Sequence, residues 1–324
     1  MEQIYDRNKK TDLQHSNRSI QKALALANKR RFRENIPLYI MLALPLTFFI
    51  IFHYLPMFWM VIAFKDYNLS DGILGSPWVG FRNFEMIFGQ IQTLSVIKNT
   101  FVLSLLAVFV GFPFPIILAI MLNEVSRNWY KKYVQTLVYL PHFFSWVIVG
   151  GIIVTIFSTT HGPINFIIKA MGGEAIPFLL QPSSWIAIFI GSGIWKEAGF
   201  SAIIYLAALT NIDPTLYEAA VIDGAGKWKQ IVFVTIPCLM PTIVLMFILA
   251  TGRIMEMGFE RVYVFSNPVV RNVSEVVSTY IYDYGVRAGE FSLTTAMGLF
   301  DSLVGLVLVL ITNKIAKKSG QALF

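Results

Sequence analysis

Long apolar segments separated by shorter polar connections make up most of the chain. A helix needs about 20 mostly apolar residues to cross the hydrocarbon core of a bilayer. Six segments meet this length: Ile36–Ala63, Val96–Leu122, Tyr133–Phe157, Trp185–Leu209, Thr235–Met255 and Leu293–Asn313. Several contain prolines, which membrane helices tolerate because neighbouring helices satisfy the freed carbonyls. The pattern predicts an all-α integral membrane protein with six transmembrane helices.

The composition agrees with a bilayer environment. Of the 324 residues, 56% are hydrophobic and 14% are charged, whereas about a quarter of the residues are charged in a typical soluble domain. The single cysteine, Cys238, excludes an internal disulfide and a cysteine-based metal site. The histidines lack ligand spacing and are interpreted as ordinary polar residues: His15, His53, His142 and His161. We therefore expect no metal site and no catalytic residues.

The distribution of Lys and Arg predicts the orientation in the membrane. Seventeen of them lie in the tails and connections on one side of the six segments, and seven lie on the other side. Basic residues concentrate on the cytoplasmic side of membrane proteins. We therefore expect both termini and the connection at 212–236 to be cytoplasmic. The basic residues form no stripe typical of nucleic-acid binding. The first apolar segment starts too late for a usual signal peptide and is interpreted as a retained span.

A polar connection between two strongly apolar segments carries the most informative motif. From Glu218 it reads Glu-Ala-Ala-Val-Ile-Asp-Gly-Ala-Gly, and then Lys-Trp-Lys-Gln-Ile-Val-Phe-Val-Thr-Ile-Pro. Asp213 followed by Pro214 is a helix start, because Asp can cap free amides and Pro suits the first turn. The pattern predicts a helix over Pro214–Ile222, a turn at the glycines that follow, and a second short helix over Lys227–Phe233.

This motif resembles the docking loop of permease subunits in ABC importers, and departs from it only at Val234. The resemblance implies a type I ABC importer permease fold, with a pair of short helices that sits in a groove on the ATPase subunit. The ATPase-docking residues would then be Glu218, Ala219, Ala220, Asp223 and Gly224. The chain has no phosphate-binding loop of the Gly-x-x-x-x-Gly-Lys-Ser/Thr type. We therefore expect a transport subunit that binds no cofactor, with ATP and Mg held by partner ATPase subunits.

Further segments resemble the LplB-type branch of carbohydrate ABC permeases, which are relatives of the larger maltose-importer subunit and include permease subunits of alginate-oligosaccharide importers. The matching segments are Phe52–Met57, Ile62–Asn68, Ser76–Phe81, Tyr139–Trp146 and Tyr205–Leu209. The resemblance implies a multi-pass protein of the bacterial cytoplasmic membrane. Its partners would be a second, non-identical permease subunit, a homodimeric ABC ATPase, an extracytoplasmic solute-binding protein and an oligosaccharide.

This resemblance also implies a division of the chain. Residues 1–35 would form a basic cytoplasmic tail, and 36–95 the first transmembrane helix with an outer aromatic loop. Residues 96–313 would form the permease core with five transmembrane helices and the docking loop at 212–236, and 314–324 a cytoplasmic tail. In the outer loop, Trp78, Phe81 and Phe84 fit an interfacial anchor. They equally fit a surface that receives the binding protein.

In maltose-type subunits the sugar-contacting stretches lie at fixed distances before and after the Glu-Ala-Ala motif. Here they fall on Gly193–Phe200 and Ala250–Met257. The substrate-path candidates are Trp195, Lys196, Glu197, Phe200, Arg253 and Glu256. Cations on this path suit an acidic sugar such as a uronate oligomer, because guanidinium and ammonium groups bind carboxylates well. The alternative is structural pairing: Arg253 with Glu256 along one helix, and Lys196 and Glu197 in a gate or a subunit interface.

Two other functions remain open at this point. An ABC permease for a different solute would share the docking motif. An ion-coupled secondary transporter would need carboxylates within the spans, and the sequence offers mainly Glu197 together with Asp301.

Overall fold

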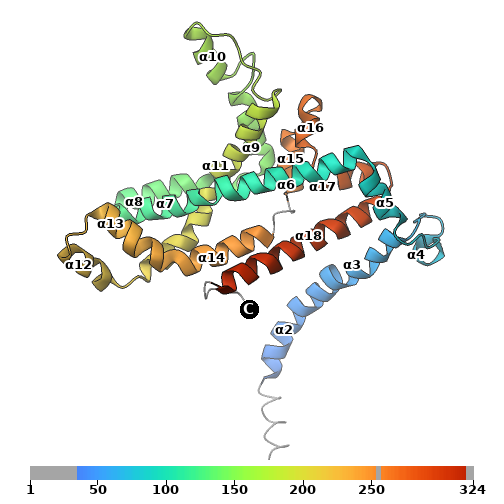
Figure 1. Cartoon of the computed structure of the whole chain (residues 1–324), viewed down its shortest axis with the longest axis horizontal. Coiled ribbons are helices and arrows are strands. Elements are labelled where there is room, and N and C mark those ends of the chain that lie inside the picture. Colours follow the sequence, from blue (N-terminus) through green and yellow to red (C-terminus); the bar gives the residue numbers. More distant parts are fainter. Residues whose placement is uncertain (1–34, 253–256, 319–324) are drawn as a thin grey trace, which may run out of the picture. The chain divides into compact units, whose positions relative to one another are not determined.

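The computed structural model describes residues 35–252 and 257–318 (Figure 1). The basic tail, the candidates Arg253 and Glu256, and the last six residues lie outside the described residues. Apart from one isolated bridge between Lys65 and Trp78, the described residues form helices and the loops between them. The chain divides into two compact units, one ending at Val61 and the other starting at Ile62.

The first unit contains one apolar helix. It consists of α2 (Ile36–Phe49), η1 (Ile50–Tyr54) and α3 (Leu55–Met57), and it runs on through η2 (Phe58–Phe64). Together these form a 29-residue span, of which residues 62–64 belong to the second unit. Its mean hydropathy is 2.0, and its most apolar stretch has no buried residue. A helix that is apolar all round needs an apolar environment on every side. Lipid or another membrane helix supplies that environment.

The second unit contains four more helices that are long and apolar enough to cross a membrane. The first joins α6 (Ile91–Gly111) to α7 (Pro113–Glu124), and the next is α11 (Pro182–Thr210). The third joins α13 (Lys227–Gln230), η4 (Ile231–Thr235) and α14 (Ile236–Gly252). The last is α18 (Phe291–Lys318). With the apolar helix that starts in the first unit, helices long and apolar enough to cross a membrane lie at five of the six expected spans.

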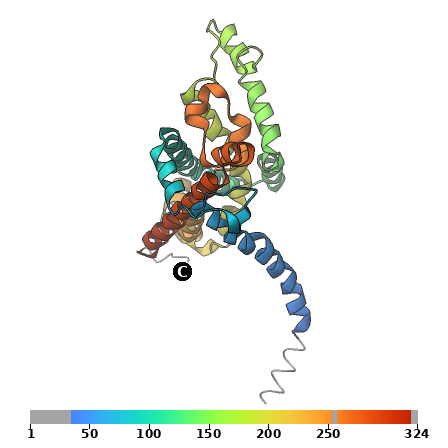
Figure 2. The same ribbon diagram turned by 90° about the vertical axis from the view of Figure 1, so that its right-hand side faces the viewer.

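The sixth expected span, Tyr133–Phe157, is not one straight helix. It is divided between α8 (Asn128–Tyr139) with η3 (Leu140–Phe143), and α9 (Trp146–Ile156), which meet at an angle of 103°. Phe144 and Ser145 are extended, and the Ser145 hydroxyl accepts a hydrogen bond from the amide of Ile148, which starts a new helix. Figure 2 shows α9 leaving the other helices steeply. The described chain therefore has six spans only if this bent pair is a single crossing.

Shorter elements connect the spans. They are α4 (Gly72–Gly75), α5 (Arg82–Gly89), α10 (Pro163–Ala170), α12 (Pro214–Ile222), α15 (Phe259–Phe265), η5 (Pro268–Val270), α16 (Arg271–Ser274), α17 (Val277–Tyr280) and η6 (Ile281–Arg287). In the aromatic loop, the ring of Phe64 stacks on that of Trp78 and also contacts Phe81 and Phe84. The residues expected at the membrane surface therefore pack into one cluster.

Helix α11 lies at the centre of the second unit and contacts α6, α7, α8 and α14. Near its start, Trp185 and Phe189 are fully buried against Val262 and Phe265 of α15. The indole Nε1 of Trp185 donates a hydrogen bond of 2.8 Å to the carbonyl of Phe265. Buried aromatic rings of this size contribute much of the packing energy of a helical core. This contact holds α15 against the first third of α11.

Candidate functional site

The connection between α11 and α14 folds as the sequence predicts. Helix α12 spans Pro214–Ile222, and the Oδ1 atom of Asp213 accepts a hydrogen bond of 2.9 Å from the amide of Thr215. This hydrogen bond lowers the pKa of the Asp213 carboxyl below its ordinary value. The helix ends before Gly224, whose φ of +75° is a left-handed conformation that favours glycine. Local sequence signals are thus sufficient to define this helix.

The same connection exposes an apolar and charged surface. Glu218, Ala219, Asp223 and Gly224 are exposed, and Ala220 is partly exposed. Large apolar side chains accompany them, and the following are exposed: Leu216, Val221, Ile222, Trp228 and Phe233. Exposed apolar groups gathered beside polar residues are typical of protein-binding surfaces. The structure therefore brings the five expected docking residues onto one exposed helix–turn segment.

This surface is tied to two of the long apolar helices. The hydroxyl of Tyr217 lies 3.0 Å from that of Thr235, which links α12 to η4. The ammonium of Lys227 lies 2.9 Å from the carboxylate of Glu124 at the end of α7. The expected second short helix is continuous with the next span, since α13, η4 and α14 follow one another without a break. A displacement of α12 would therefore be transmitted directly to the long apolar helices.

A second polar cluster lies midway along α11. The ammonium of Lys196 is buried and donates a 2.7 Å hydrogen bond to the carbonyl of His142. The same ammonium lies 3.2 Å from Oε1 of Glu197, whose Oε2 lies 2.8 Å from Nδ1 of His142. The ring of Phe200 stacks on the imidazole at a centroid distance of 3.9 Å. Lys196 and Glu197 are therefore paired with each other within this chain, whereas the structural alternative expected each of them in a gate or a subunit interface.

A cavity of about 290 Å³ opens beside this cluster. Its walls come from α6, α7, α11, α14 and α15, and they include Phe112, Gly193, Glu197, Tyr205, Met246 and Arg261. Glu197 is the expected path residue that lines it. Trp195 and Phe200 are exposed outside this lining, and Lys196 is enclosed behind it. The walls are mostly apolar with a few polar groups, which is the usual composition of a small-molecule site.

Arg261 of α15 is the charged residue at this cavity that the sequence reasoning missed. Its Cζ atom lies 4.0 Å from the ring centre of Phe189 and 5.0 Å from that of Trp146, and its Nη2 donates to the carbonyl of Phe189. In the sequence, Arg261 is counted only as a basic residue of a connecting segment. His142 was likewise assigned no role. The packing that brings both residues to α11 has no local signature.

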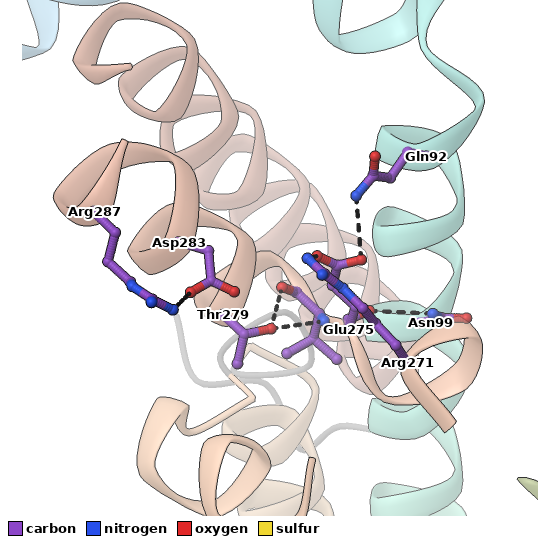
Figure 3. A network of polar contacts seen from close by, with 8 residues as sticks. Gln92, Asn99, Arg271, Glu275, Thr279, Asp283 and Arg287 are labelled. Atoms are coloured by element: carbon purple, nitrogen blue, oxygen red, sulfur yellow. Dashed lines mark hydrogen bonds and ion pairs between the residues drawn. The ribbon is translucent and has the colours of Figure 1, made fainter. Parts of the chain in front are cut away.

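A third polar group surrounds Arg271 and Arg287 (Figure 3). Arg271 pairs with Glu275 at 2.6 Å, and Arg287 pairs with Asp283 at 3.2 Å. The hydrogen bond and charge of Glu275 raise the pKa of the Arg271 guanidinium. The side-chain amide of Asn99 on α6 donates to the Glu275 carbonyl at 3.1 Å, which ties the group to a long helix. A cavity of about 410 Å³ is lined by both arginines.

The comparison with known families decides the assignment. Residues 111–320 match the family described as the binding-protein-dependent transport system inner membrane component. The chain belongs to this family. The recognition of the chain as a binding-protein-dependent ABC importer permease subunit is thereby confirmed.

The relatives of this chain belong to the carbohydrate branch of these permeases. The chain is 46% identical to the polygalacturonan/rhamnogalacturonan transport system permease protein YteP of Bacillus subtilis, over 88% of each chain. It is 41% identical to the protein LplB of the same organism, over 88% of this chain and 89% of that one. A solved bacterial alginate ABC transporter, in complex with an alginate pentasaccharide-bound periplasmic protein, contains a chain of 41% identity. That match covers 90% of this chain and 98% of the other, with a TM-score of 0.83.

These findings establish the general function of the chain. The chain is a membrane permease subunit of a sugar or polysaccharide ABC importer, with the type I permease fold. Its relatives are transport subunits, which fits the expectation of a subunit without an enzymatic reaction of its own.

Proposed function

We propose that this permease imports acidic oligosaccharides, forms half of a translocation path, and is driven by an ATPase that binds its exposed α12 segment. The observation that carries the proposal is the exposed helix–turn surface at Glu218–Gly224. Tyr217 of α12 contacts Thr235 of η4, and Lys227 of the following α13 pairs with Glu124 of α7. A short helix linked in this way to the spans can transmit the closure of a partner to the membrane helices as a lever. The motif resemblance supports the identity of that partner.

The acidic nature of the substrate is supported by two observations. Relatives of similar length serve polygalacturonan transport and the import of the acidic polysaccharide alginate. In this chain, the polar cluster of α11 and α15 brings two cations, Lys196 and Arg261, close to a single carboxylate, Glu197. An excess of positive charge beside a mostly apolar cavity favours an anionic solute.

The remaining partners follow from the same assembly. A second, non-identical permease subunit would cover the exposed apolar faces of the spans and complete the path. A homodimeric ABC ATPase would hold ATP and Mg, and this chain would bind neither. The complex would lie in the bacterial cytoplasmic membrane, with both termini and α12 on the cytoplasmic side, where the basic residues gather.

The group around Arg271 and Arg287 is the best candidate for the surface that meets an extracytoplasmic binding protein. The side chains of the two arginines are 55% and 66% exposed, whereas those of their partners Glu275 and Asp283 are 10% and 33% exposed. The carboxylates therefore point inward and the positive charge points outward. A partner surface rich in carboxylates would complement it.

ATP hydrolysis by the reconstituted complex tests this function. The complex in proteoliposomes is mixed with its binding protein carrying either oligouronates or neutral oligosaccharides of the same length. We expect oligouronate-loaded binding protein to stimulate ATP hydrolysis and uptake more strongly than binding protein loaded with neutral sugar. Stimulation by neutral sugars alone would overturn the acidic assignment. Uptake without any ATP hydrolysis would overturn the ABC mechanism.

A further inference from the structure

The two cations near the α11 cavity differ in their availability to a solute. Lys196 is 6% exposed, and its ammonium contacts the carbonyl of His142, the carboxylate of Glu197 and the ring of Trp146. Its hydrogen-bonding capacity is therefore met within the chain. Arg261 lines the cavity itself, together with Gly193 and Glu197. A solute in the cavity meets Arg261 and not Lys196.

The Arg261 guanidinium has donors without acceptors. Its side chain is largely enclosed, one of its N–H groups reaches the carbonyl of Phe189, and Nε has no hydrogen-bond partner. Among the residues that the structure describes, no carboxylate lies within ion-pair distance of it. A guanidinium stays protonated at physiological pH and carries five donors in a planar fork. An enclosed cation of this kind favours an incoming anion.

The neighbouring groups compensate this charge only in part. The faces of Phe189 and Trp146 attract a cation through their ring quadrupoles, but they accept no strong hydrogen bond. Glu197, the acid that lines the same cavity, has one carboxylate oxygen beside His142 and the other beside Lys196. An enclosed charge without a hydrogen-bonded counter-ion is unfavourable in free energy. An anion that supplies two acceptor oxygens would therefore bind favourably to Arg261.

The cavity also limits what that anion can be. Its volume of about 290 Å³ is at the lower end of the range for ligand sites, so it admits one small unit of a polymer at a time. Phe112 offers an apolar wall, and Glu197 offers an acceptor for hydroxyl groups on the same cavity. A sugar ring with a carboxylate on one edge and hydroxyls on another would match this arrangement. Inorganic anions would leave the apolar wall and Glu197 unused.

We propose that Arg261 is the specificity residue of the path, which binds the carboxylate of a single uronate unit while Glu197 accepts from its hydroxyls. This proposal rests on the proposed function, because it assumes that sugars pass through this cavity. It adds that discrimination between acidic and neutral units occurs in the permease, at α15, in addition to any selection by the binding protein.

Uptake of two probes by the reconstituted complex tests the assignment. The probes are a tri-uronate and its methyl ester, which has the same rings without the charge. Each is offered on binding protein at saturation, verified by direct measurement of its binding. For Arg261→Gln, we expect uptake of the tri-uronate to fall by about tenfold or more, as loss of a charge-assisted hydrogen-bonded pair implies. Uptake of the ester should change little.

Two further variants separate recognition from folding. Arg261→Lys keeps the positive charge but loses the planar pair of donors of the guanidinium. We expect its tri-uronate uptake to lie between that of Arg261→Gln and that of the wild type. Lys169→Gln removes a positive charge from an exposed site on α10, and we expect it to behave as wild type. Equal loss of both probes in Arg261→Gln, or no loss of either, would overturn the assignment. Absence of uptake of both probes by the wild-type complex would instead contradict the proposed function.

Discussion

Gly193 of α11 leaves the space that the Arg261 guanidinium of α15 occupies. A methyl carbon at Gly193 would lie 2.6 Å from Cζ of Arg261, much closer than two unbonded carbons can approach. The two residues are 68 positions apart in the sequence by their numbers, yet they share one wall of the cavity. The position of the charge therefore depends on the absence of a side chain on the facing helix.

Replacement of Gly193 by alanine should displace the guanidinium without removing its charge. Because the end of an arginine side chain can move, we expect the assembled complex to keep its melting temperature to within a few degrees. Uptake of an acidic oligosaccharide should fall, while basal ATP hydrolysis stays unchanged. The control is Gly191→Ala on the same helix, where an added methyl meets nothing within 4 Å. Equal uptake by the two variants would contradict the role of this contact.

Glu197 is expected to stabilise the enclosed charge of Lys196. Removal of one partner from a hydrogen-bonded charged pair in a largely enclosed site costs about 1–3 kcal/mol, reduced here because the Glu197 side chain is 43% exposed. We therefore expect Glu197→Gln to lower the melting temperature of the purified complex. Lys196→Met combined with Glu197→Gln should recover part of that loss, because the uncompensated charge is then gone. A double variant less stable than the sum of the single variants would contradict the pairing.

Gly224 should be required for the shape of the α12 segment. Its φ of +75° costs an alanine about 1–2 kcal/mol, so Gly224→Ala should distort the turn that follows Ile222. We expect stimulated ATP hydrolysis to fall relative to wild type, measured at equal amounts of assembled complex. Gly172→Ala provides a matched control, since Gly172 has a φ of +84° and open space around it outside this segment. The same loss in both variants would indicate a general folding defect.

The outward arginines should set the affinity for the binding protein. Reversal of both charges in Arg271→Glu/Arg287→Glu should raise the concentration of loaded binding protein needed for half-maximal ATP hydrolysis, with the maximal rate less affected. The effect should shrink as salt concentration rises, because exposed charges are screened over about 10 Å at 0.1 M salt. Lys169→Glu changes the charge of another exposed basic residue and should have little effect. A loss of maximal rate without a change in affinity would contradict this role.

Local signals explain which elements could be predicted from the sequence. Asp213, Pro214 and Gly224 mark the start and end of α12, and the helix has those bounds. Five spans could be predicted for a similar reason, because the length and hydropathy of an apolar segment can be read from that segment alone. The break near Ser145 escaped prediction because Pro141 alone does not distinguish a kink from an end in a membrane helix.

The cavity could be predicted only in part. Glu197 was found through its spacing from the docking motif. Arg261 and His142 were missed, because their roles depend on packing against α11 from segments far away in the sequence. The sequence does contain one indication for Arg261, because it lies in a short, mostly apolar and aromatic segment. Arginine is rarely buried in such a segment unless another group pairs with it. No periodic pattern identifies its partner.

In the proposed complex, the exposed α12 segment connects this permease to an ATPase. The most direct measurement is the amount of ATPase subunit that co-purifies with the wild-type chain and with Glu218→Lys, which reverses an exposed charge of that segment. Both complexes should contain equal amounts of the second permease subunit, as a check on assembly. We predict that the ATPase is retained by the wild type and lost from Glu218→Lys. Retention of equal amounts by both chains would contradict the account.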